Sequence, residues 1–147
     1  MGGDTVSLEE NKAIVRKVIE AAINQQNLDL LDDLSAPDYV DHTHQLSPES
    51  VKHFMNMIFK AFPDWHETIE DIIAEGDKVW VHAEATGTHT GEYRGIAPTG
   101  KKITSKGVNI YRIVNGKFVE GWSVEDSMDF LMQLGVIEYK GFPDEVS

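Results

Sequence analysis

The chain contains no cysteine among its 147 residues. A chain without cysteine forms no disulfide, offers no thiolate to a metal and has no cysteine nucleophile, so its fold must rest on the hydrophobic core. No apolar run approaches the roughly 20 residues that cross a bilayer. The N-terminal MGGDTVSLEEN also lacks the basic and apolar regions of a signal peptide. We therefore expect a cytoplasmic protein with no membrane partner.

Basic residues are also few, because 13 lysines and arginines face 25 acidic residues and the formal net charge is -12. Nucleic acids and anionic lipids bind clustered Lys and Arg, so we expect no nucleic-acid partner. A hydrophobic content of 41% suits one globular domain spanning residues 1–147. We expect its core to cover about residues 8–137 and the tail, 138–147, to be flexible.

The strongest secondary-structure pattern is a hairpin in the C-terminal half. Residues 102–114 and 117–124 are rich in β-branched and aromatic side chains, and Asn115-Gly116 between them is typical of a type I′ turn. Residues 78–90 alternate in the same manner, with Val79, Val81, Ala83 and Ala85 on one face and Trp80, His82, Glu84 and Thr86 on the other. The pattern predicts three long antiparallel strands, and residues 65–74 predict a fourth.

Helices are predicted before and after these strands. Ser7 and Glu10 form a capping-box pattern that predicts a helix from residue 8 to about 25. Asn27 is expected to cap a short helix that ends before Ala36-Pro37, and Ser47-Pro48 to begin a third. A last helix, 127–134, is expected after a cap at Asp126.

This order of helices, strands and a final helix predicts an α+β fold. Its helices should pack on one face of a curved antiparallel sheet and enclose a pocket.

Several segments resemble one known family. FPDWHETIEDIIAEGDKV, THTGEYRGIAPTGK and LMQLG are similar to the SnoaL-like polyketide cyclases and their predicted ester cyclase relatives, and the resemblance covers residues 10–135. It implies a cone-shaped α+β barrel, a homodimer joined through the sheet face, and the absence of metal and organic cofactors. It also implies an aldol ring closure on an aromatic polyketide.

Two positions depart from that family's pattern. The aspartate that acts as the principal acid and base in the cyclases aligns with Ser123, and a cyclase histidine aligns with Asn109. Because a serine cannot act as that base unaided, a cyclase of this sequence would need its acid and base from another residue.

Strand alternation supplies candidate catalytic residues independently of the resemblance. His89 continues the face of Val79, and a neutral imidazole both accepts and donates protons near neutral pH. A hydrogen bond from His89 to a turn at the strand end is the alternative. Glu67 falls on an apolar face, where burial would raise its pKa. The alternative is a slip of the strand register that leaves Glu67 solvated on the surface, and we favour this alternative. Glu125 is placed to substitute for the missing aspartate.

The same alternation supplies candidate ligand-binding residues, which are Asn109, Ser123, His42, Tyr39, Trp65 and Tyr111. Asp41 can orient His42 or His44, and we expect these histidines at the rim of the pocket. The His-x-His pattern is a weak signal for a metal, so we expect none.

Three functions remain open on this basis. The first is a cofactor-independent enzyme that moves a proton next to the carbonyl group of a small apolar compound. The second is a binding module for a hydrophobic molecule that performs no chemistry. The third is a dimeric scaffold protein.

Overall fold

The computed structural model describes residues 3–138, 140 and 141. Its elements in chain order are α1 (Gly3–Lys17), the π-helix η1 (Val18–Ile23), α2 (Leu30–Leu34), β1 (Ser35–Asp41), α3 (Pro48–Ala61), β2 (His66–Glu75), β3 (Lys78–Thr88), β4 (Lys102–Val114), β5 (Lys117–Glu125) and α4 (Ser127–Gln133). The tail that was expected to be flexible lies largely outside the described residues.

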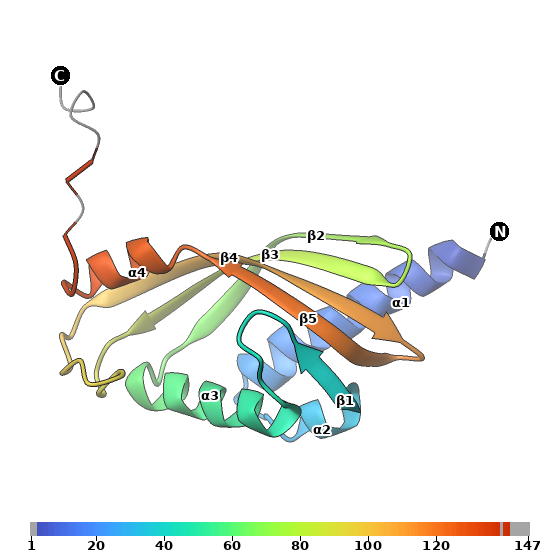
Figure 1. Cartoon of the computed structure of the whole chain (residues 1–147), viewed down its shortest axis with the longest axis horizontal. Helices are drawn as coiled ribbons and strands as arrows, with labels where there is room; N and C mark the ends of the chain where they lie inside the picture. The colour runs from blue at the N-terminus through green and yellow to red at the C-terminus, as the bar shows by residue number, and fades with distance from the viewer. Residues whose placement is uncertain (1–2, 139, 142–147) are drawn as a thin grey trace.

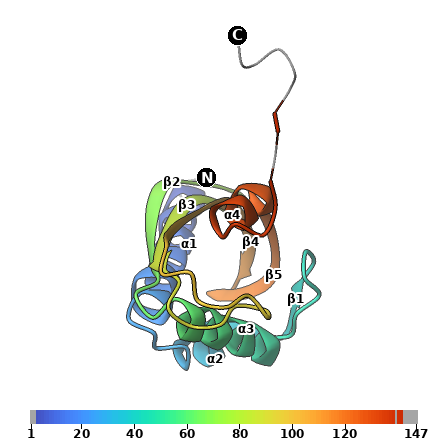
Figure 2. The same ribbon diagram turned by 90° about the vertical axis from the view of Figure 1, so that its left-hand side faces the viewer.

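The strands form one five-stranded sheet in the order β1-β5-β4-β3-β2. Figure 1 shows α3 and α2 on one side of this sheet, and Figure 2 shows the sheet curving around the space above them without closing. The predicted α+β architecture, a curved sheet covered by the N-terminal helices, is thus confirmed.

One strand runs against the prediction of a purely antiparallel sheet. β1 pairs with β5 in parallel, with Asp41 opposite Gly121. In the sequence, a hairpin turn marks a pair of antiparallel strands. The parallel strands β1 and β5 are far apart in the chain, and no turn joins them. Local patterns therefore could not reveal the pairing.

The first helix also differs from its prediction. It begins at Gly3, so Ser7 lies inside the helix and not at its N-cap. From Val18 it continues as a π-helix, which ends where the amide of Asn24 donates to the carbonyl of Ile19 at 2.9 Å. The next helix begins at Leu30, later than Asn27 suggested.

Turns and later caps follow the sequence closely. Asn115 and Gly116 both have positive φ, 51° and 76°, as the predicted turn requires. Ser47 accepts from the amide of Ser50, and the Asp126 side chain accepts from the amide of Asp129. These short-range signals fix the positions of α3, α4 and the β4–β5 hairpin.

The core lies between the concave face of the sheet and the helices. Val79, Val81, Ala83 and Ala85 are all buried, as the alternation predicted, whereas Trp80 is 46% exposed on the convex face. At one end of the core, Phe62 is fully buried with its ring 5.2–5.9 Å from the rings of His89, Trp65, Tyr93 and Phe130. The candidate site lies at the middle of the concave face.

Candidate functional site

A cavity of about 600 Å³ lies between the concave face and the helices. This volume falls within the range of about 300–1,000 Å³ that is usual for small-molecule sites. Its wall is mostly apolar and includes Val18, Ile19, Leu31, Ile58, Phe118 and Leu131. A small set of polar side chains interrupts this wall, and most of them come from the strands.

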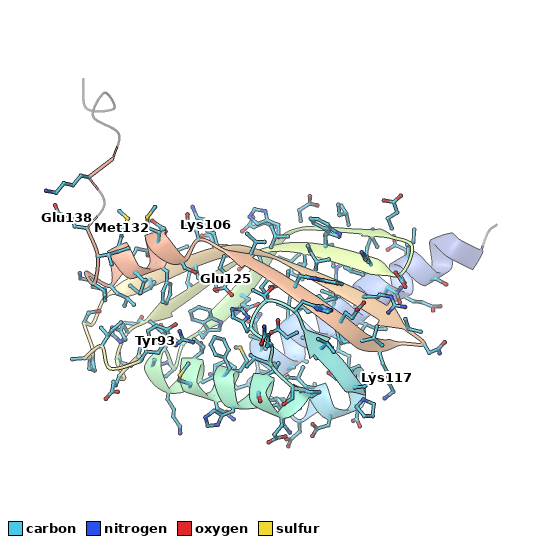
Figure 3. All side chains as sticks on the ribbon, in the orientation of Figure 1. Tyr93, Lys106, Lys117, Glu125, Met132 and Glu138 are labelled. Carbon is cyan, nitrogen blue, oxygen red and sulfur yellow. The ribbon has the colours of Figure 1, made fainter. Side chains whose placement is uncertain are left out.

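Strand register brings the polar residues of β4 and β5 together. Asn109 lies directly opposite Ser123, and Glu125 lies opposite Gly107. Because directly opposed residues of neighbouring strands share a face, these side chains belong to the concave side, and all of them line the cavity. Figure 3 shows Glu125 near the α4 end of the molecule and Lys117 at the other end of β5. These three polar residues thus lie on the face that strand alternation predicted for them.

Glu67 enters the cavity from β2. A bulge lies between Ile69 and Asp71, beyond Glu67, so the alternation from Trp65 through Ile69 is undisturbed. The side-chain amide of Asn24 bonds the backbone of Glu67 twice: its Nδ2 donates to the Glu67 carbonyl at 2.9 Å, and its Oδ1 accepts from the Glu67 N–H at 2.8 Å. These two bonds fix the backbone of Glu67. Our preference for a solvated Glu67 was therefore wrong, because its side chain lines the cavity.

Burial raises the pKa of the Glu67 carboxyl above its ordinary value of 4.5. The Trp65 indole N–H, 3.3 Å from the carboxylate, opposes the rise, and the charge of Glu125 adds to it. A carboxyl group in this environment holds its proton to higher pH than a solvated glutamate and is suited to proton transfer.

Two tyrosines complete the wall near Glu67. Burial raises the pKa of both Tyr39 and Tyr111. The charge of Asp41 raises the pKa of Tyr39 further. The pKa of Tyr111 is raised further by Tyr39 and, to a smaller extent, by Glu67. Both side chains therefore stay neutral phenols at physiological pH and can donate hydrogen bonds. A Cβ at position 121 would collide with the Tyr39 hydroxyl, so Gly121 gives this ring its place.

His89 is not among the residues that line the cavity. It is fully buried, and its Nδ1 accepts from the Thr99 amide at 3.2 Å, so the proton of the neutral ring lies on Nε2. The backbone N–H of His89 donates to the Lys101 carbonyl, and the His89 carbonyl accepts from the Gly100 N–H, both at 2.9 Å. The alternative reading of the sequence, in which His89 bonds a turn at the strand end, describes this geometry.

The two histidines of the β1–α3 loop lie in different surroundings. His42 stacks on Trp122, with ring centroids 4.8 Å apart, and its Nε2 is 3.2 Å from Glu120, outside the main cavity. His44 lines the cavity with Asp41. Within the described part of the chain, no three His, Asp or Glu side chains converge as metal ligands do.

The structure therefore brings together Glu67, Glu125, Asn109, Ser123, Tyr39, Trp65 and Tyr111, and it separates His89 and His42 from them. Sequence reasoning missed Asn24, whose contact with Glu67 spans 43 positions of sequence and leaves no local signal. It also missed Arg94, which lines the cavity and lies over the Phe54 ring at 5.9 Å. Among residues 3–138, 140 and 141, no helix is long and apolar enough to cross a membrane.

A model of the SnoaL-like polyketide cyclase family matches residues 13–134. The chain belongs to this family. The nogalonic acid methyl ester cyclase of Streptomyces nogalater is 26% identical over 78% of this chain and 90% of the relative. The aklanonic acid methyl ester cyclase AcmA of Streptomyces galilaeus is 27% identical over 87% of this chain and 92% of the relative.

Solved structures of other SnoaL-like proteins have the same fold. AclR of Streptomyces galilaeus, described as a proposed hydroxylase, superposes with a TM-score of 0.83 at 32% identity, covering 90% of this chain and 89% of AclR. IdmH of Streptomyces antibioticus, described as a proposed polyketide cyclase, gives 0.77 at 30% identity, covering 86% of this chain and 99% of IdmH.

Replacing Glu67 should change how the stability of this SnoaL-like protein depends on pH. Because the folded pKa of Glu67 is raised above 4.5, the unfolded chain binds fewer protons there, and wild-type stability falls as pH rises through the window above 4.5. Glu67→Gln removes this loss. We expect the variant to gain stability relative to wild type between acidic and neutral pH in urea unfolding.

Glu70→Gln is the matched control, because it removes an exposed carboxyl group from the same strand. An equal gain in both variants would show that the effect comes from net charge and not from the burial of Glu67.

Replacing His89 should affect the fold more than the cavity. His89→Leu removes the buried acceptor of the Thr99 amide, and loss of such a partner costs about 1–3 kcal/mol of unfolding free energy. We expect this loss in urea unfolding, with little change in the affinity for an aromatic probe such as 2-naphthol, measured by calorimetry. A stable variant that no longer binds the probe would place His89 in the site.

Proposed function

We propose that this protein moves a proton next to the carbonyl group of a small, flat, mostly apolar compound. The observation that carries the proposal is a largely apolar cavity that contains acidic side chains, among them Glu67 and Glu125, with hydrogen-bond donors beside them. A desolvated carboxyl with a raised pKa serves as an acid and a base near neutral pH.

The reaction has a simple balance. A basic group of the site removes a proton from the carbon next to the carbonyl, the C–H electron pair forms the enolate, and negative charge moves to oxygen. Asn109 and Ser123, which are directly opposed on β4 and β5, are placed to donate hydrogen bonds to that oxygen. The enolate carbon then takes the proton back or attacks a second carbonyl to close a ring.

The relatives favour a polyketide-type carbonyl compound as the substrate class. Two of them are named as cyclases of nogalonic acid methyl ester and aklanonic acid methyl ester, and the carbonyl group of an ester gives such chemistry a starting point. The aromatic side chains of Trp65, Tyr39 and Phe54 along the cavity suit a flat ring system.

Proton exchange at carbon tests this function without knowledge of the natural substrate. Wild-type protein should exchange the α-protons of 2-tetralone for deuterium in D₂O faster than buffer alone, as followed by proton NMR. Glu67→Gln should lower the rate by about 100-fold or more, the usual contribution of a general acid or base. Glu70→Gln should retain the wild-type rate.

Wild-type protein that binds 2-tetralone but exchanges it no faster than buffer would contradict the proposal. The cavity would then belong to a module that binds a hydrophobic molecule without chemistry.

We also propose that two copies pair through the convex sheet face. Ile73, Trp80, Ile110 and Trp122 lie opposite one another across four strands, and Ile73 and Trp80 are 58% and 46% exposed. Ile73 and Trp80 are exposed apolar neighbours in this row, and such side chains on a sheet are typical of a surface that another protein covers.

Sedimentation velocity should therefore show a dimer of wild-type protein and a monomer of Trp80→Glu. His53→Glu adds the same charge on the exposed side of α3 and should leave the dimer intact. A monomeric wild type would overturn this arrangement.

A further inference from the structure

The loop between β1 and α3 carries a carboxylate and an imidazole that the proton transfer described above leaves unused. Asp41 is only 8% exposed at the end of β1. One of its oxygens accepts from the amides of Thr43 and His44, at 2.9 and 3.0 Å. The carboxylate is thus held at a fixed place by its own loop, and its second oxygen remains for another partner.

This loop is attached to the sheet beside Ser123. The Thr43 hydroxyl donates to the Ser123 carbonyl at 3.2 Å and accepts from the Ser123 amide at 2.7 Å. One residue earlier, the His42 amide donates to the Gly121 carbonyl at 2.9 Å. These bonds hold His44 against the strand that carries Ser123 and Glu125.

The His44 ring lies between the carboxylate and an aromatic side chain. Its Nδ1 is 3.5 Å from the free oxygen of Asp41, and the ring stacks on Phe54 with centroids 6.2 Å apart. Asp41, His44 and Phe54 all line the cavity. Because Nδ1 faces Asp41, Nε2 is the nitrogen left for a ligand.

We propose that His44 is a catalytic residue of the cavity and that Asp41 positions it. The inference rests on the proposed function. Nε2 of His44 takes the α-proton of the carbonyl compound, so the C–H bond breaks and an N–H bond forms while Asp41 holds the proton on Nδ1. The imidazolium then returns a proton to the enolate carbon or to the oxygen formed in ring closure. Glu67 supplies the second proton-transfer group of the site.

Several charged side chains lie around the His44 ring or line the same cavity. Asp41 faces His44 directly, and Arg94 lies beyond Phe54, 5.9 Å from its ring centre. Glu67, Glu125 and Asp126 line the same cavity.

The exchange of 2-tetralone protons measures the contribution of His44. His44→Gln should lower the exchange rate by about 100-fold, as expected for loss of a general base. His53→Gln removes an exposed imidazole next to Phe54 in sequence and should keep the wild-type rate. A wild-type rate in His44→Gln, or a larger loss in His42→Gln, would overturn the assignment.

Asp41→Asn separates positioning from folding. Asparagine keeps an oxygen for the two loop amides but presents N–H to Nδ1, so the ring should adopt the tautomer with its proton on Nε2. Long-range proton–nitrogen NMR should show the Nδ1–H tautomer in wild type and the Nε2–H tautomer in Asp41→Asn, with exchange reduced at least tenfold. An unchanged tautomer and rate would mean that Asp41 only shapes the loop.

The pattern across variants tells the two proposals apart. Loss of exchange in Glu67→Gln with full exchange in His44→Gln would overturn the role of His44 and leave the proposed function standing. Absence of exchange in wild type would overturn both.

Discussion

The pairing of β4 between β3 and β5 is the constraint on which the site depends. Backbone hydrogen bonds hold Asn109 opposite both Val81 and Ser123, and strand geometry then determines which side chains face inward. A shift of one residue would turn Asn109 and Ser123 outward and bring Ile110 to the concave face. The cavity would then lose these two polar groups from its centre.

Much of the fold follows from short-range signals. The Asn115-Gly116 turn, the cap at Ser47 and the alternation from Val79 to Ala85 each act over a few residues, and the structure keeps them all. The parallel pairing of β1 was not predictable in this way, because it joins segments about 80 residues apart, such as Asp41 and Gly121. The start of α1 was missed because a capping pattern can also lie within a continuing helix.

The same distinction between local and long-range signals applies to the candidate site. Alternation placed the polar residues of β4 and β5, such as Asn109, Ser123 and Glu125, but it could not place the histidines beyond the ends of β1 and β3. His89 sits where β3 gives way to a loop, and the Thr99 amide binds its ring away from the cavity. His42 and His44 differ by two positions, yet only His44 lines the main cavity, and this depends on the bonds between Thr43 and β5.

The two outer strands of the open sheet each carry a feature that hinders pairing with another molecule. An open sheet exposes unpaired N–H and C=O groups along each edge, where a strand of another molecule can add. At one edge, Pro37 removes a donor from β1. At the other, Asn24 occupies an N–H and a C=O of β2, and the nearby bulge interrupts the regular spacing. The contact that fixes Glu67 in the cavity therefore also protects the sheet against edge-to-edge aggregation.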